Sequence, residues 1–548
     1  MRPGVTARLV ALVILAATAA VTLISQRPPA PLPADAPPTA FSAERALPLV
    51  ADLAREPRPL GSAANARVRD DLAARLTALG LTTAVRDGNV VATLPGAAPT
   101  GQVVLSAHHD SVPQGPGAAD DAAGVASILE TVRALRTGPP LRNDLTVLLT
   151  DGEEAGLLGM RRWVRTELPR APIVVLNQEA RGVTGPALLF RTSPGNAGLV
   201  EAMRAVPHPA GDSGLVAIFR LLPNDTDLSV VLGAGRPGID SAFIEGPEKY
   251  HTAADSPANL DPRSVQSQGG TLLALARELG GTDLAPLDPT ASGLPARPDA
   301  VYFPLGDLLV TYPVAWEWPL ALLAVAGLVA VTLAARHRGR TTARGALLAV
   351  VTSPLPLVVA AALAVGLWQV LLVLRPAYAD TGPFLDRPGP YQVATGALAV
   401  LAVLAWYLPV RRRVGRTAAT VGAAGLLAAL GVLTAATVPG ASFLVTWPAL
   451  GLVAGLAVAV ALRDGDVATT TAGAVAAVPA VVFLAPFAVA SFGIGGVATP
   501  VPAVAFALLG LSVAAVLDPS TRDRRDAVLP ATALTAAVAA TAAGLLTG

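Results

Sequence analysis

The sequence contains no cysteine, a single lysine (Lys249) and only five histidines, and 14% of its 548 residues are charged. The absence of cysteine excludes disulfides, thiol nucleophiles and thiolate metal ligands, so any metal ion must be held by histidine, carboxylates or water. The net charge of +1 gives no sign of a nucleic-acid partner. Apolar residues, by contrast, make up 53% of the chain, which is too many for an ordinary soluble protein of this length.

The apolar residues are concentrated in nine segments of helix length. The first, residues 9–25, predicts either an uncleaved anchor or a signal peptide, and its length favours the anchor. Each of the other eight is long enough to cross about 30 Å of hydrocarbon as a helix. These eight lie at about 314–335, 346–374, 391–410, 417–438, 442–462, 467–492, 497–517 and 527–547. We therefore predict an integral, multi-pass membrane protein with membrane lipid around these segments.

The arginines between the apolar segments predict an orientation in the cell membrane. Most of the arginine after residue 314 lies in the turns 336–344, 411–416, 463–466 and 518–526. By the positive-inside rule, these turns and the N-terminus, which carries Arg2 and Arg8, are cytoplasmic. An uncleaved anchor then places residues 26–313 on the extracytoplasmic side.

The composition divides the chain into five parts. These are the anchor (1–26), a linker (27–41), a mixed charged domain (42–280), a Pro/Gly-rich linker (281–313) and a transmembrane domain of about eight helices (314–548). Within the charged domain, helical patterns such as 61–80 and 121–138 alternate with short β-rich runs, and 82–96 has the pattern of a hairpin. This alternation predicts an α/β domain with a mixed central sheet flanked by helices, joined to an all-α membrane domain.

Three of the β-rich runs end in ionisable residues. "GQVVLSAHHD", "NDLTVLLTDGEE" and "APIVVLNQEARG" bring these residues to the carboxyl ends of strands, where α/β sheets form their sites. Carboxylates placed this close repel one another. Two divalent cations would compensate this repulsion, because their charge of about +4 balances a total ligand charge of about −3. The candidate ligands are His108, Asp120, Glu154, Glu179 and His251. His208 and His337 lie in a turn and an arginine-rich loop and are poor candidates.

The order of these motifs resembles a known family. "PRPLGSAAN", "AHHDSVPQGPGAADDAAGVA", "TDGEEAGLLG", "NQEARG", "NDTDLSVV" and "GIDSAFIEGPEKYHTAADSPANL" together are similar to the family-28 zinc metallopeptidases of the aminopeptidase Y type. With its apolar segments, the chain is most similar to the multi-spanning branch, which includes the vacuolar membrane proteases and the endoplasmic reticulum metallopeptidase. The resemblance implies a membrane-anchored di-zinc exopeptidase, in the first place an aminopeptidase, that hydrolyses peptide substrates outside the cytoplasm.

The resemblance also implies the metal ligands. His108 resembles the first ligand and Asp120 the carboxylate that bridges two zinc ions. Glu154 and His251 resemble further ligands, and Glu179 stands where the family has Asp or Glu. The neighbouring His109 stands where an aromatic or aliphatic residue is usual, and strand alternation turns its side chain away from that of His108.

Three further residues resemble the catalytic groups of the family. Glu153 resembles the general base that takes a proton from a metal-activated water and passes it to the leaving amine. Tyr250 resembles the group that donates to the oxyanion, and Asp110 the carboxylate that orients the first histidine ligand.

Several assignments stay open in the sequence. Asp225 and Asp227 are either structural or line a substrate pocket, while Arg181 and Arg191 belong either to the fold or to a site for a substrate carboxylate. Two other functions also remain: a one-zinc acyltransferase that cyclises N-terminal glutamine, or a transporter or receptor whose α/β domain only binds ligand. The apolar segments contain almost no ionisable residues, which disfavours an ion path through them. The oligomeric state is not predicted.

Overall fold

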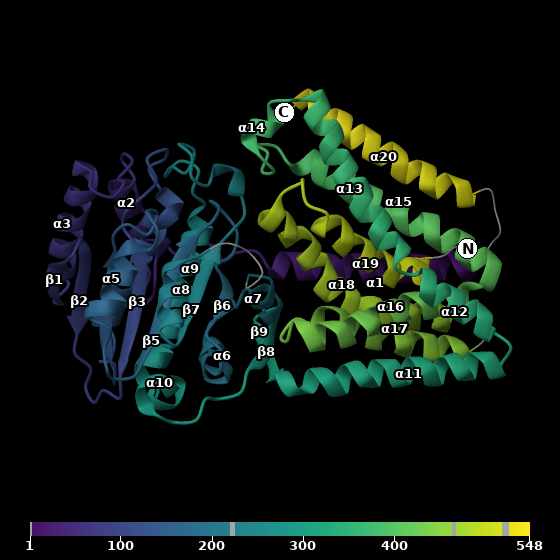
Figure 1. The fold of residues 1–548 in the computed structure, drawn as a ribbon, viewed down its shortest axis with the longest axis horizontal. Coiled ribbons are helices and arrows are strands. Elements are labelled where there is room, and N and C mark those ends of the chain that lie inside the picture. Colours follow the sequence, from purple (N-terminus) through teal and green to yellow (C-terminus); the bar gives the residue numbers. More distant parts are fainter. Residues whose placement is uncertain (1–2, 220–224, 463–466, 518–524, 548) are drawn as a thin grey trace. The chain divides into compact units, whose positions relative to one another are not determined.

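The computed structural model describes residues 3–219, 225–462, 467–517 and 525–547. The chain divides into two compact units, one of Gln26–Val314 and one that combines Met1–Ser25 with Ala315–Gly548. The first unit contains a seven-stranded sheet with helices, whereas the second is helical (Figure 1). The predicted combination of a mixed α/β sheet with an all-α part is therefore confirmed.

The sheet has the strand order β1-β2-β4-β3-β5-β7-β6. Its strands are β1 (Thr82–Arg86), β2 (Asn89–Leu94), β3 (Gln102–His108), β4 (Asp144–Thr150), β5 (Ile173–Ala180), β6 (Leu188–Thr192) and β7 (Gly238–Phe243). The four central strands β4, β3, β5 and β7 run parallel, and the pairs at both edges are antiparallel. The predicted hairpin forms from β1 and β2, with Asp87 and Gly88 at positive φ in its two-residue turn.

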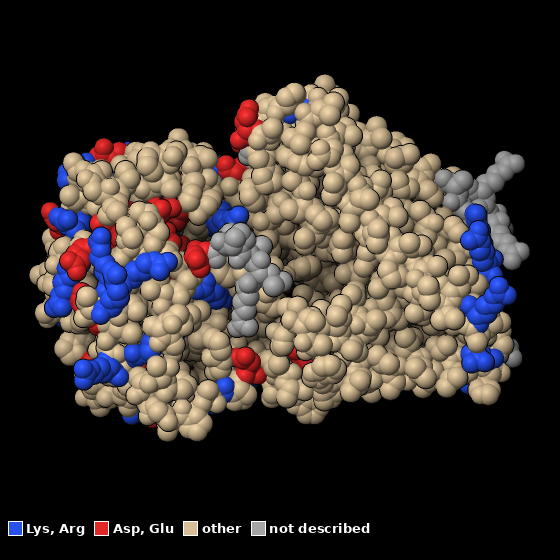
Figure 2. Space-filling view, viewed as in Figure 1, with Lys and Arg blue, Asp and Glu red and all other residues tan. Residues whose placement is uncertain are grey.

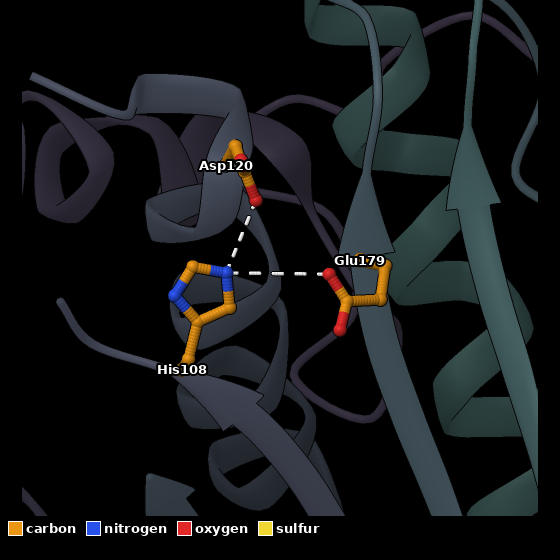
Figure 3. A group of neighbouring side chains, drawn as sticks. All are labelled: His108, Asp120 and Glu179. Atoms are coloured by element: carbon orange, nitrogen blue, oxygen red, sulfur yellow. Dashed lines mark hydrogen bonds and ion pairs between the residues drawn. The ribbon is translucent and has the colours of Figure 1, made fainter. Parts of the chain in front are cut away.

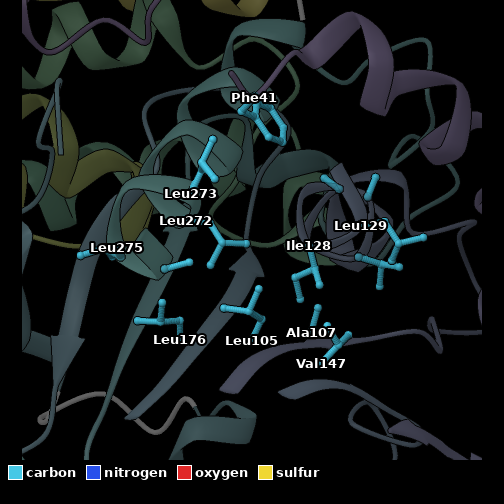
Figure 4. Packing of buried hydrophobic residues seen from close by; sticks show 14 of the residues in the cluster. Phe41, Leu105, Ala107, Ile128, Leu129, Val147, Leu176, Leu272, Leu273 and Leu275 are labelled. Carbon is cyan, nitrogen blue, oxygen red and sulfur yellow. The ribbon is translucent and has the colours of Figure 1, made fainter. Parts of the chain in front are cut away.

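Helices cover both faces of the sheet, which explains why its central strands are continuously apolar. One face packs against α2 (Ala43–Leu53), α4 (Gly124–Arg136) and α9 (Pro262–Gly281), and the other against α5 (Leu158–Thr166) and α8 (Asp227–Gly233). Figure 4 shows leucine and isoleucine side chains of α4 and α9 over strand residues such as Leu105 and Leu176. This packing fixes the carboxyl ends of the parallel strands relative to one another.

The remaining elements of this unit lie around the sheet. They are α3 (Ala63–Ala78), a π-helical turn (Ala118–Ala123), α6 (Ala197–Met203), α7 (Ser213–Phe219), α10 (Pro289–Ser292), the 3-10 turns Pro247–Lys249 and Ala285–Leu287, β8 (Ala300–Leu305) and β9 (Leu308–Pro313). The two last strands form a separate hairpin.

Two segments expected to be linkers are folded onto this unit. In 27–41, Phe41 is buried against Gly269, where a Cβ atom would lie 2.0 Å from the phenyl ring. In 281–313, Tyr302 of the β8–β9 hairpin is buried and donates a hydrogen bond to Leu189 O at 3.0 Å.

The second unit is built from apolar helices. They are α1 (Pro3–Ser25), α11 (Glu317–His337), α12 (Ala343–Thr352), α13 (Leu355–Leu374), α15 (Gly389–Val414), α16 (Arg416–Thr437), α17 (Phe443–Ala461), α18 (Val467–Gly495), α19 (Val501–Leu517) and α20 (Arg525–Thr547), with the short α14 (Tyr378–Thr381) between α13 and α15. In the described part of the chain, seven helical segments are long and apolar enough to cross a membrane. The apolar part of α1 (Leu9–Ser25) and α19 (Val501–Leu517) are shorter apolar stretches.

One predicted span of this unit is divided in the structure. The predicted span 346–374 consists of α12 and α13, which are separated at Ser353 and Pro354, because proline lacks the N–H that would continue the helix. Figure 2 shows few charged side chains on this unit apart from a group of arginines at one end, where α11 ends and α12 begins. The turns 463–466 and 518–524 lie outside the described residues.

Candidate metal centre

The candidate residues lie together at the carboxyl ends of three adjacent parallel strands, β4, β3 and β5. His108 is the last residue of β3, and Glu179 lies near the end of the adjacent β5. The turn that follows β4, on the other side of β3, carries Glu153 and Glu154. The sheet topology therefore brings together side chains that are up to about 70 residues apart in sequence.

Asp120 reaches this edge through the loop between β3 and α4. The loop turns at Gly117, which has a φ of 59°, and a Cβ atom there would lie 2.2 Å from Asp120 O. Glycine is therefore required at this position. The Asp120 side chain is buried, with a residue exposure of 4%.

The first cluster consists of His108, Asp120 and Glu179. His108 Nε2 lies 3.1 Å from Asp120 Oδ1 and 4.0 Å from Glu179 Oε2. Figure 3 shows the imidazole facing both carboxylates. The three atoms that these residues offer lie within 4.8 Å of one another, close enough to share one metal ion.

The second cluster consists of Asp120, Glu154 and His251. His251 Nε2 lies 3.2 Å from Asp120 Oδ2 and 3.1 Å from Glu154 Oε2. The two oxygens of Asp120 thus face different clusters, as a bridging carboxylate would require. Glu154 Oε1 is buried without a hydrogen-bond partner, and a cation at this position would satisfy it. The nitrogen and oxygen donors of both clusters suit zinc.

Asp110 connects the first cluster to the turn after β4. Its Oδ1 lies 3.4 Å from His108 Nδ1, on the side of the ring opposite to the cluster. Its two oxygens also accept hydrogen bonds from Glu153 N at 3.1 Å and Glu154 N at 3.3 Å. Asp110 can therefore orient the imidazole and the turn together, which is how carboxylates commonly support metal-bound histidine.

Glu153 and Tyr250 lie beside the clusters without belonging to them. Burial, opposed in part by His108, raises the pKa of Glu153 well above its usual range. The Tyr250 ring stacks on the His251 imidazole with 3.7 Å between ring centroids. Burial and the nearby charge of Asp120 raise the pKa of Tyr250, so its phenol keeps its proton and can donate a hydrogen bond.

The shifted pKa values of the clustered residues indicate that the buried carboxylates lack enough positive charge around them. Burial, together with the charge of Glu153, raises the pKa of Glu179 well above its usual range. Although burial opposes it, hydrogen bonds with Asp120 and Glu154 raise the pKa of His251 to about 10. The pocket of the protein alone therefore retains protons, and divalent cations would displace them.

The structure also places the residues whose roles were open. His109 is buried away from both clusters, and its Nε2 lies 3.2 Å from Gly88 O. Asp227 is buried and accepts a hydrogen bond from Thr150, whereas Asp225 is exposed. Asp227 thus belongs to the interior of the fold beside the site.

The two arginines and His208 lie outside the clusters. Arg191 is buried, lies 3.4 Å from Asp240 Oδ2 and stacks over Phe219, so its guanidinium is already engaged. Arg181 follows β5 and donates its backbone N–H to Phe243 O. His208 lies on the surface beside Asp307.

Three supporting residues were not identified from the sequence. Asp255 accepts hydrogen bonds from Ala119 N and Asp120 N at 2.7 and 3.1 Å. Asn177 donates one to Glu179 Oε1 at 3.1 Å, and Arg58 holds the loop before Asp120. All three lie inside motifs that carry the family resemblance, which is the signal that could have drawn attention to them.

The fold and the two clusters define an α/β domain with a candidate metal centre at the carboxyl edge of its sheet. Residues 89–276 match the model of a family described as Peptidase family M28, which confirms the resemblance drawn from the motifs.

Two relatives named as a metallopeptidase and a protease match part of this chain. Endoplasmic reticulum metallopeptidase 1 of Rattus norvegicus is 34% identical over 219 residues, covering 38% of this chain and 24% of the relative. A vacuolar membrane protease of Coccidioides posadasii (strain RMSCC 757 / Silveira) is 35% identical over 191 residues, covering 34% of this chain and 19% of the relative. The matches thus span about a quarter or less of the length of these relatives.

Solved structures with a similar chain trace have lower identities. A glutaminyl cyclase of Porphyromonas gingivalis is 22% identical with a TM-score of 0.37, covering 44% of this chain and 99% of that chain. A zinc aminopeptidase from Bacillus subtilis is 16% identical with a TM-score of 0.37, covering 44% of this chain and 96% of that chain.

Proposed function

We propose that the chain is a membrane-anchored di-zinc peptidase that removes single residues from the ends of peptides, as an aminopeptidase in the first place. The observation that carries this proposal is the placement of Asp120, whose two oxygens lie 3.1 Å from His108 and 3.2 Å from His251. A carboxylate placed in this way is suited to bridge two cations. Relatives named as metallopeptidase and protease support the same reading.

The residues of the chain would hold two zinc ions and position the substrate around them. His108, Asp120 and Glu179 would hold one ion, and Asp120, Glu154 and His251 the other. Bound zinc supplies Lewis-acid polarisation of a carbonyl group and lowers the pKa of water.

The neighbouring residues would move the protons of peptide hydrolysis. Glu153 takes a proton from the water that attacks the peptide carbonyl and transfers it to the leaving amine, so it ends the reaction in its starting state. The raised pKa of its carboxyl group suits both acceptance and release of that proton. Tyr250 donates a hydrogen bond to the oxyanion, and Asp110 keeps His108 in position.

The decisive experiment counts metal and measures hydrolysis in the same full-length preparation. We expect two zinc ions per chain and release of the reporter group from aminoacyl substrates. His108→Ala should abolish turnover and lower the zinc content, whereas His208→Ala, which changes an exposed histidine outside both clusters, should alter neither. One zinc per chain with cyclisation of N-terminal glutamine would favour the acyltransferase instead, and a metal-free active protein would contradict both.

We further propose that the peptidase unit is extracytoplasmic and that the N-terminus is cytoplasmic. The arginines at one end of the helical unit support this orientation (Figure 2). The chain has no cysteine, so any introduced cysteine is its only thiol. In intact cells, a membrane-impermeant maleimide should label Arg67→Cys in the peptidase unit, whereas Arg344→Cys should react only after permeabilisation. The reverse labelling pattern would show that the peptidase unit faces the cytoplasm.

A further inference from the structure

Arg58 is a fully buried arginine next to the candidate metal centre. Its exposure is 1%, and it lies in the motif "PRPLGSAAN", between α2 and α3. The side chain donates from three nitrogens to backbone carbonyls: from Nε to His109 O at 2.8 Å, from Nη1 to Pro116 O, and from Nη2 to Gly117 O at 3.0 Å. A buried guanidinium used for carbonyls rather than for a carboxylate requires an explanation, because burying a charge is costly.

These three carbonyls belong to the two ends of one loop. His109 directly follows the metal-cluster residue His108, and Gly117 precedes Asp120 by three residues. The guanidinium therefore ties the start of the loop to its end. The planar fork of arginine suits this task, since its donors point in fixed directions.

The backbone of Arg58 strengthens the same connection. Arg58 N donates to Ser111 Oγ at 2.9 Å, and Ser111 N donates to Arg58 O at 3.3 Å. Ser111 Oγ also lies 3.1 Å from Gly115 O, inside the loop. The motif thus holds the loop at its start, middle and end.

The opposite side of the loop is held by the segment that carries His251. Asp255 accepts hydrogen bonds from Ala119 N and Asp120 N. At Gly115, a Cβ atom would lie 2.1 Å from Thr252 O, so the two segments are in direct contact. With Asp255 on one side, Arg58 supplies the second support that fixes Asp120.

We propose that Arg58 is a positioning residue that clamps the 109–117 loop so that Asp120 presents one oxygen to each metal cluster. This inference rests on the proposed function, since it assigns Arg58 a purpose through the metal ions that Asp120 would bridge. Arg58 contacts neither substrate nor metal in this arrangement. It acts through the backbone of the loop.

The charge of Arg58 makes the proposal testable. If Arg58 acted only as a positive charge near the acidic pocket, its removal would strengthen cation binding. If it clamps the loop, its removal weakens cation binding although a repulsive charge has gone. The two explanations predict opposite changes in the zinc dissociation constant.

The experiment measures zinc affinity of the full-length protein in detergent by competition with a chromogenic chelator. We expect Arg58→Met to weaken zinc binding at least tenfold, and Arg58→Lys, which keeps the charge but loses the fork, to weaken it as well. The matched controls are Arg236→Met and Arg236→Lys. Arg236 is also buried and donates to two carbonyls, Pro169 O and Ala171 O, and to Asp288 Oδ2. These carbonyls precede the amino end of β5, whereas the metal clusters lie at the carboxyl ends of the strands.

The outcomes separate this proposal from the proposed function. The control variants should lower the melting temperature while changing the zinc dissociation constant less than twofold. Unchanged or tighter zinc binding in a folded Arg58→Met or Arg58→Lys protein would overturn the clamp and leave the proposed function intact. Absence of zinc binding in the wild type would overturn the proposed function itself. If Arg58→Met does not fold, the lysine variant and the hydrogen exchange of the 109–117 amides, expected to be faster than in wild type, decide the question.

Discussion

Replacement of Glu153 by glutamine tests the proposed chemical step separately from the proposed metal binding. Glutamine keeps the size of the side chain but cannot accept a proton as a carboxylate does. Glu153 lies outside both clusters, so all residues of these clusters remain after the change. Its backbone N–H, which donates to Asp110 Oδ1 at 3.1 Å, is also unaffected. We therefore expect metal content near that of wild type and a large loss of turnover.

The size of the loss follows from the role of a general base. A positioned base contributes about 10²- to 10⁴-fold to a reaction, which corresponds to about 2.7–5.4 kcal/mol of barrier height. Because the side chain of Glu153 is held in a partly buried turn, water cannot freely replace it as a proton acceptor. The loss should appear in kcat, with a small effect on KM, since the proton moves in the transition state.

The assay compares Glu153→Gln with Glu154→Gln in the same preparation. Glu154 Oε2 lies 3.1 Å from His251 Nε2 in the second cluster, so its replacement should lower the metal content as well as turnover. A surface change, Glu201→Gln, serves as the unaffected control.

Two results would refute this reasoning. Turnover of Glu153→Gln within about tenfold of wild type would remove Glu153 from the role of base. Loss of metal in Glu153→Gln with retention in Glu154→Gln would mean that the two adjacent glutamates have exchanged roles.

Three further changes probe the metal centre. Asn177→Asp places a carboxylate beside Glu179 and Asp240, so zinc content should fall from two ions to one, and an unchanged count would exclude a supporting role for this amide. Chelation should lower the melting temperature, since a cation at 100 times its dissociation constant stabilises by about 2.7 kcal/mol, and an identical melting curve with chelator would argue against a bound ion. Zinc affinity should rise with pH between 6 and 8. The pKa values of His108 and His251 are raised (that of His251 to about 10), so both side chains carry protons in the metal-free protein. Each proton that zinc displaces makes the affinity about tenfold higher per pH unit. A pH-independent affinity would contradict this linkage.

The parts of the fold with a short-range pattern were predictable from the sequence. The β1–β2 hairpin follows from Asp87-Gly88 between alternating apolar residues. The strands that end at His108 and just after Glu179 follow from their β-branched runs. The β8–β9 hairpin was not predicted, because Pro304 and the proline-rich flank obscure its alternation.

The supporting residues of the site were harder to predict because their partners are distant in sequence. Arg58 donates to Gly117, 59 residues away, and Asp255 accepts from Ala119, 136 residues away. Neither spacing leaves a periodic signal. Their roles depend on how the sheet and loops bring the segments together, which local patterns do not determine.

Two buried carboxylates elsewhere in this unit give a separate reason to assign cations to the pocket. Glu130 is paired with Arg45 and Arg133, and Asp288 with Arg236, so permanent positive charges neutralise these acids. Arginine remains charged at any physiological pH and cannot become a metal ligand. These acids are therefore fixed parts of the fold.

At the carboxyl ends of the parallel strands, the carboxylates are paired with histidine rather than with arginine. Asp120 lies between His108 and His251, and the nearby Arg58 donates to carbonyls of the loop. An imidazole can lose its proton and offer a lone pair to a metal ion, so its charge is exchangeable where that of arginine is not. Among the described residues, the ion pairs of the carboxylates in both clusters are formed with His108 and His251, whose protons divalent cations can displace. A structural ion-pair cluster would have no reason to use histidine in place of arginine.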